Sequence, residues 1–134
     1  MIEAYSQNID VNANSNVPFE IVKVNKGYFE DIQNTSITFN KCGVYRVAVN
    51  GTVSATEAGN VGIELVKNGV LQEDTLTQVT VAENNLYPIS FSTFVQVSSN
   101  NTNCACSSPT SINVRNVGIA ATFELIKIDV DKIC

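Results

Sequence analysis

Residues 42–70 read CGVYRVAVNGTVSATEAGNVGIELVKNGV, and this stretch decides the fold class. Tyr45, Val47 and Val49 recur at every second residue, which is the period of a strand with one buried face. The alternation breaks in the middle of the stretch and then restarts, until Asn68-Gly69 ends it. An Asn-Gly pair is the strongest short signal for a hairpin turn. The stretch therefore predicts two strands of an antiparallel sheet.

Short alternating runs of the same kind, separated by turn signals, fill the rest of the chain, and no helical period is long enough to compete with them. Eight to ten such strands predict an all-β protein, an antiparallel β-sandwich that forms one domain over residues 1–134. Residues 98–111 are predicted to form a polar insertion and residues 129–134 a tail. The residues expected in the core are Phe19, Phe39, Tyr45, Val47, Val49, Ile63 and Leu65.

Composition excludes several classes of function. The net charge is −5 and no cluster of Lys and Arg exists, so the basic face that nucleic-acid binding needs is absent. No apolar run reaches the roughly 18 residues of a membrane span. The first ten residues have neither the basic nor the apolar region of a signal peptide, so synthesis in a cytosol is expected.

Nothing in the sequence forms a catalytic set. The chain of 134 residues contains no His, which removes the commonest general base and the commonest metal ligand. The carboxylates of Glu20, Glu30 and Asp31 have no defined separation of the kind that glycoside hydrolysis requires. The sequence predicts a protein that is not an enzyme and needs no cofactor.

Two small groups leave alternatives open. Cys104-Ala105-Cys106, with Cys42 and Cys134, can be free thiols, a disulfide formed outside the cell, or a metal site. The metal site is disfavoured because no His is present to complete four ligands. Asp129 and Asp131 fit either a solvated tail or a contribution to a Ca²⁺ site near a trimer axis, since Ca²⁺ requires several oxygen ligands.

The order of the motifs resembles a known family. Val17-Pro18-Phe19 comes first, Phe39 and Gly43-x-Tyr45 follow, and Leu65-x-x-Asn68-Gly69 comes later. Over residues 4–128 this resembles the C1q/tumour-necrosis-factor-like (C1q/TNF-like) jelly roll, most of all its bacterial and bacteriophage branch.

The resemblance implies a homotrimer whose axis is lined by the strands near residues 89–97 and 121–128. Both strands carry apolar residues on each of their faces, more than one core accommodates. The residues expected at the trimer interface are Phe91, Phe94, Gln96, Phe123, Leu125, Ile126 and Ile128.

These features favour a structural protein of a bacteriophage virion, a trimeric jelly roll that decorates the capsid or forms a head fibre. Its expected partners are further copies of itself and the major capsid protein or other virion proteins. Its expected location is the virion surface, with residues 1–16 as an arm for that contact. The alternative is a receptor-binding or adhesion head of a phage tail fibre or of a spore-surface filament, which would bind a host glycan or protein.

Overall fold

The computed structural model describes residues 1–26, 30–33, 35–97 and 105–133. Among them, strands dominate, joined by turns and one short 3-10 helix. The elements are β1 (Ile2–Val11), β2 (Ile21–Asn25), β3 (Glu30–Gln33), β4 (Ser36–Lys41), β5 (Gly43–Ser54), β6 (Gly59–Lys67), β7 (Val70–Leu71), η1 (Glu73–Thr75), β8 (Thr77–Val81), β9 (Tyr87–Val97), β10 (Ala105–Asn116) and β11 (Ala121–Lys132).

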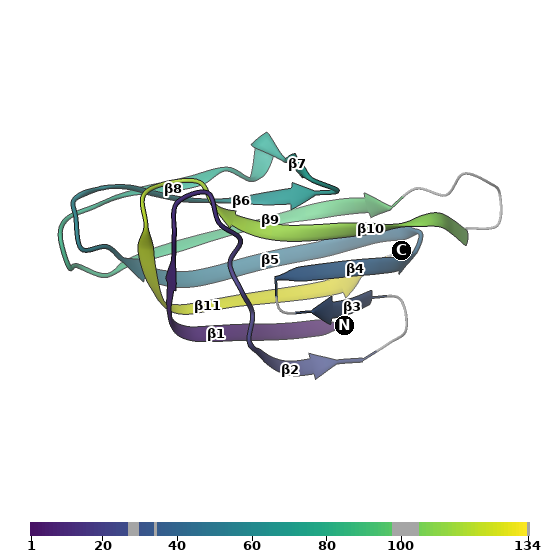
Figure 1. Ribbon diagram of the computed structural model, residues 1–134. Helices are drawn as coiled ribbons and strands as arrows, with labels where there is room; N and C mark the ends of the chain where they lie inside the picture. Colours follow the sequence, from purple (N-terminus) through teal and green to yellow (C-terminus); the bar gives the residue numbers. More distant parts are fainter. Residues whose placement is uncertain (27–29, 34, 98–104, 134) are drawn as a thin grey trace.

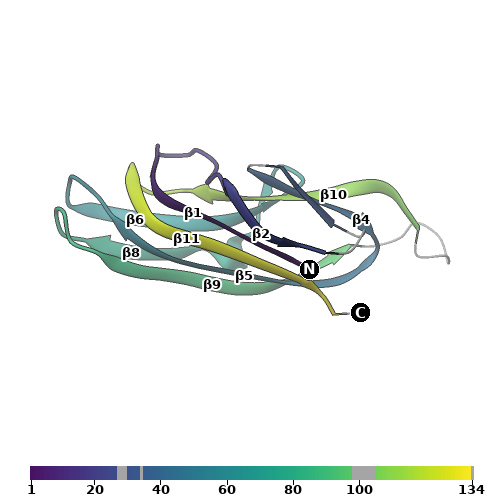
Figure 2. The same ribbon diagram turned by 90° about the horizontal axis from the view of Figure 1, so that it is seen from below.

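The strands form two antiparallel sheets in a jelly-roll order (Figure 1). Sheet A has the order β2-β1-β11-β5-β9, so the first and last long strands of the chain are neighbours. Sheet B has the order β3-β4-β10-β6-β7, and β8 also pairs with β6. In Figure 2, β10 of sheet B lies on one side of the molecule, and β5 and β9 of sheet A lie on the other. The fold is the β-sandwich that the alternating pattern predicted.

One hydrophobic core lies between the two sheets. Within it the ring centroids of Phe39 and Tyr45 are 4.2 Å apart, and the Tyr45 hydroxyl donates a hydrogen bond of 2.7 Å to the Lys41 carbonyl oxygen. The seven residues that the sequence assigned to the core are each at most 3% exposed.

The hairpin signal in the opening stretch corresponds to a real turn. Lys67 pairs with Val70 across it. Asn68 and Gly69 have φ of 50° and 82°, and a two-residue turn of type I′ requires positive φ at both central positions. This turn connects β6 to β7.

Three predictions about the ends and the insertion were wrong. Residues 1–16 are not a separate arm, because β1 occupies most of them and lies between β2 and β11, with Ile2 completely buried. Residues 129–134 are not simply a tail, because β11 continues to Lys132 and Val130 is buried. Part of the expected polar insertion, from residue 105 onward, belongs to β10. In each case backbone pairing with a distant strand outweighs a polar local composition.

Among the described residues, no helix is long and apolar enough to cross a membrane.

Candidate interaction surface

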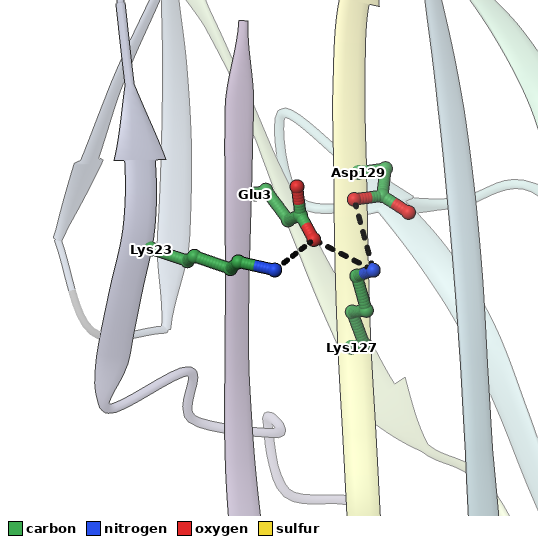
Figure 3. Close-up of polar contacts among 4 residues, drawn as sticks. All are labelled: Glu3, Lys23, Lys127 and Asp129. Atoms are coloured by element: carbon green, nitrogen blue, oxygen red, sulfur yellow. Dashed lines mark ion pairs between the residues drawn. The ribbon is translucent and has the colours of Figure 1, made fainter.

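The outer face of sheet A carries a band of charged side chains (Figure 3). Lys127 on β11 lies 2.7 Å from Glu3 on β1 and 3.9 Å from Asp129, measured from its Nζ to their carboxylate oxygens. Lys23 on the edge strand β2 lies 3.6 Å from the same Glu3 carboxylate. The strand period of two puts these side chains on the face opposite the core. Three neighbouring strands thus share one charge network.

The network shifts the pKa values of its members in different directions. The hydrogen bond from Lys127 lowers the pKa of Glu3, and the same bond raises the pKa of Lys127. Desolvation raises the pKa of Asp129, and the nearby Glu3 and Asp131 carboxylates add to the rise, while Lys127 and Arg46 oppose it. The negative charge of Glu3 is therefore well compensated by Lys127, whereas the negative charge of Asp129 is not fully compensated.

A hollow of about 280 Å³ lies on this face, toward the end of the sandwich that holds the termini. Asp131 and Arg46 extend the charge band into it, and Ala48 forms part of its lining. Asp129 and Asp131, which the sequence offered as a tail or as calcium ligands, thus share the hollow with two cations. Among the described residues, no group of three or more His, Cys, Asp or Glu side chains could hold a metal ion.

The edge of the same sheet is uncharged and exposes one aromatic ring. Phe94 on β9 is 66% exposed and lies directly across from Arg46 on β5. The ammonium group of Lys67 donates a hydrogen bond of 2.9 Å to the backbone carbonyl oxygen of Gln96. The eleven residues of β9 include no charged side chain, although edge strands commonly carry charge that discourages pairing with other chains.

The expected trimer-interface residues divide into two groups. Phe94, Gln96 and Leu125 are exposed on the outer side of sheet A. Phe91 is half-buried and packs against the core. Three further members are at most 1% exposed and lie inside the sandwich, so assigning them to an interface was wrong: Phe123, Ile126 and Ile128.

For Ile126 and Ile128 the error has a local cause. Glu124 is an extra residue in β11 relative to β5, because Phe123 pairs with Val53 while Leu125 pairs with Thr52. Beyond such a bulge the inward face passes from odd to even residues. The strict alternation assumed from the sequence places the second half of β11 the wrong way round.

The charge band was missed by sequence reasoning. A signal was present, since Glu3 and Tyr5 alternate with buried residues in β1, as Lys127 and Asp129 do in β11. The pairing of β1 with β11, which brings Tyr5 opposite Lys127, joins residues that are more than 120 positions apart. A local pattern does not show such a contact.

The structure places the cysteine and carboxylate candidates only in part. Cys42 is buried at 6% exposure. Cys104 and Cys134 lie outside the described residues, and the backbone of Cys106 belongs to β10. Glu20 is exposed beside β2, whereas Glu30 and Asp31 belong to β3.

Comparison with known proteins defines the fold class. No protein-family model and no curated protein sequence matches the chain. The globular domain of zebrafish complement 1qA protein is similar, with a TM-score of 0.69 and 7% identity over 99% of this chain and 96% of that one. Murine APRIL at pH 5.0 is similar, with a TM-score of 0.65 and 9% identity over 98% of each chain.

A viral structure is similar too. PRD1 vertex protein P5, a phage protein, has a TM-score of 0.57 and 14% identity over 99% of this chain and 96% of that one. At these identities the likeness concerns the fold. The chain therefore has the C1q/TNF-like jelly-roll fold, which it shares with these three structures.

Proposed function

We propose that this chain is a non-enzymatic structural protein of a bacteriophage virion, which assembles as a homotrimer and decorates the capsid or forms a head fibre. The observation that carries the proposal is the outer face of sheet A. It holds a half-buried charge network and ends in an uncharged edge strand with Phe94 66% exposed. Exposed apolar groups next to ordered charges are typical of surfaces that bind another protein.

Two further points support the assignment to a virion. The resemblance to the bacteriophage branch of the C1q/TNF-like family implies a trimer, with sheet A turned toward its axis. PRD1 vertex protein P5, whose name places it at a virion vertex, shares the fold over nearly the whole of both chains. A decoration protein acts by covering apolar and backbone groups on neighbouring shell subunits.

Sedimentation and native mass measurements test self-association. The chain has a mass of 14.5 kDa, and at micromolar concentration we expect a species of three times that mass. A species of one chain mass under these conditions would contradict the proposal. Dilution with either method then gives the dissociation constant.

A second experiment tests the virion partner. Purified protein is mixed with empty capsids of the phage that encodes it and, separately, with whole host cells. We expect co-sedimentation with capsids at a fixed ratio to the shell subunits and no retention on cells. Binding to cells alone would favour the adhesion head.

One structural feature favours that alternative enough to keep it in the test. Ile2 pairs with Val130, so both termini lie at one end of the sandwich (Figure 1). The opposite end presents a hollow of about 180 Å³ lined by Asp10, Asn12 and Thr56 among others. A head attached through its termini would present this end to a receptor.

A further inference from the structure

Strand β1 carries an insertion that matches the one in β11. Ile9 pairs with Phe123 and Gln7 with Leu125, which leaves Asn8 as the extra residue of β1. It lies at the level of Glu124, the extra residue of β11. We call Gln7, Asn8, Glu124 and Leu125 the paired bulge.

The core does not need the paired bulge. The register between β1 and β11 is the same before and after it, because each strand gains one residue. Without Asn8 and Glu124, a single outward residue would separate Ser6 from Ile9, and likewise Phe123 from Ile126. All of these flanking residues would keep their inward positions, and the register of β11 against β5 would become continuous.

Three residues in or beside the paired bulge nevertheless have features that only the bulge requires. Asn8 has φ of 50°, a left-handed conformation that is uncommon for residues other than Gly and that Asn adopts more readily than most. A Cβ on Gly51 would lie 2.7 Å from the Leu125 carbonyl oxygen and 2.8 Å from Ile126 Cδ1, so β5 requires glycine beside the bulge. Leu125 is turned outward and is 40% exposed. Features that strain a fold without serving its core point to a function.

On the outer face of sheet A, the paired bulge forms a hollow of about 480 Å³ together with Thr52. Its lining offers one exposed leucine, one carboxylate and two carboxamides. A carboxamide both donates and accepts hydrogen bonds, so it can pair with the unused N–H and C=O groups of a strand edge. Leucine needs an apolar partner. The complementary surface is an uncharged edge strand with an exposed apolar side chain.

The chain itself carries such an edge. β9 is the last strand of sheet A and has no charged residue, and Phe94 is its most exposed large apolar side chain. Residues of η1 line a small hollow together with Phe94. Leu76, which directly follows η1, is 46% exposed. A patch and its complement on different sides of one chain produce a head-to-tail contact, which closes into a ring when the rotation allows.

We infer that the paired bulge is a seat for the β9 edge of a second copy of this chain, with Leu125 against Phe94 of the partner. The inference rests on the proposed self-association and deepens it. It centres the contact on a local insertion that continues the outer face of sheet A beyond the charge band.

The main experiment deletes Asn8 and Glu124 together. The double deletion is expected to keep the circular dichroism spectrum and a single cooperative urea transition. Its dissociation constant for self-association is expected to rise at least about tenfold, the equivalent of ~1.4 kcal/mol. Deletion of Glu124 alone breaks the matched register, and we expect that variant to lose cooperative unfolding.

A second measurement tests the contact between Leu125 and Phe94 of the partner even if the double deletion does not fold. Leu125→Ala and Phe94→Ala, alone and combined, form a double-mutant cycle on the dissociation constant. If the two side chains touch between copies, the combined variant weakens association by less than the product of the single effects. Independent effects, or none, would overturn the inference.

The outcomes separate the two proposals. A wild-type chain that stays a single copy at micromolar concentration refutes both self-association and the seat. A wild-type trimer whose dissociation constant is unchanged by the double deletion, or by the substitutions in the cycle, refutes the seat alone.

Discussion

The outward-facing side chains of the two sheets are covered by the rest of the chain to different extents. In sheet B, Glu64 and Val66 on β6 point away from the core yet are only 5% and 2% exposed. The chain covers them itself, because β7, η1 and β8 run along the edge of β6, where Thr75 Oγ1 accepts a hydrogen bond of 2.8 Å from the Leu65 amide.

In sheet A, no described segment covers the corresponding face. Arg46 and Asn50, which point outward from β5, are exposed, and so is Phe94 on the next strand. The chain thus completes sheet B within one copy and leaves sheet A open. A partner is therefore expected on sheet A, and perturbations of the two faces should have different consequences.

The largest expected effect comes from the inner face of sheet A. Ile128→Ala should lower the free energy of unfolding by about 2–5 kcal/mol, because it opens a cavity among fully buried neighbours. Urea unfolding at concentrations where a single copy predominates measures this. The matched control is Leu125→Ala on the outward side of the same strand, expected to change stability by less than about 0.5 kcal/mol. Equal effects of the two variants would show that β11 does not have the described inside and outside.

The next largest effect on stability is expected from a substitution on the outer face of sheet B, in contrast to one on the outer face of sheet A. Val66→Ala on sheet B should cost about 2 kcal/mol, from ~0.8 kcal/mol for each of two carbons plus a cavity contribution. Phe94→Ala on sheet A should leave the stability of one copy within about 0.5 kcal/mol, although it removes a larger side chain. Its effect should instead appear in the dissociation constant. A large loss of stability from Phe94→Ala would mean that sheet A is closed within one copy.

Periodicity alone predicted β5, β6, the Asn68-Gly69 hairpin and the core, because each of these depends on a local pattern. It failed in β11, where Phe123 and Leu125 fit one phase of the alternation and Ile126 and Ile128 fit the other. The sequence around the bulge admits either assignment. The pairing with β5, which has no extra residue, decides between them, and that information is not local.

The outer surface was harder to predict for a similar reason. Glu3 and Lys127 are the most closely paired charges of sheet A, at 2.7 Å, and lie near opposite ends of the chain. Residues 1–16 were expected to form an arm, and only the position of β1 between β2 and β11 shows it to be interior to the sheet. Long-range strand pairing determines which polar residues form a site.

The covered face of sheet B should give a pH dependence of stability. Desolvation raises the pKa of Glu64, and Glu73 on η1 adds to the rise while Arg115 on β10 opposes it. The unfolded chain releases the Glu64 proton near the ordinary value of 4.5, before the folded chain does, so stability from this group falls as pH rises above that value. The variant Glu64→Gln has no such loss.

We therefore expect Glu64→Gln to become more stable relative to wild type as pH increases from 4 toward 7. Urea unfolding at several pH values measures the difference. Glu83→Gln, at an exposed position, controls for the loss of one negative charge. A difference that shrinks with increasing pH would show that attraction to Arg115 outweighs the burial of Glu64.

The smallest effect belongs to the open face, where Lys127 and Glu3 form an ion pair whose side chains are 37% and 15% exposed. Because solvent screens such a pair, a double-mutant cycle of Glu3→Gln and Lys127→Met should give a coupling in one copy smaller than the effect of Val66→Ala. The lowered pKa of Glu3 means that this coupling is present at neutral pH and is lost as pH falls through the folded pKa.

The same cycle, repeated at concentrations where the assembled form predominates, tests whether sheet A is covered by a second copy. A second copy seated on sheet A would exclude water from the band, so the coupling between Glu3 and Lys127 should increase on assembly. A coupling that is identical in dilute and assembled protein would place the contact elsewhere. Sheet A would then be open in the assembled protein as well, and the difference between the two outer faces would not mark the binding surface.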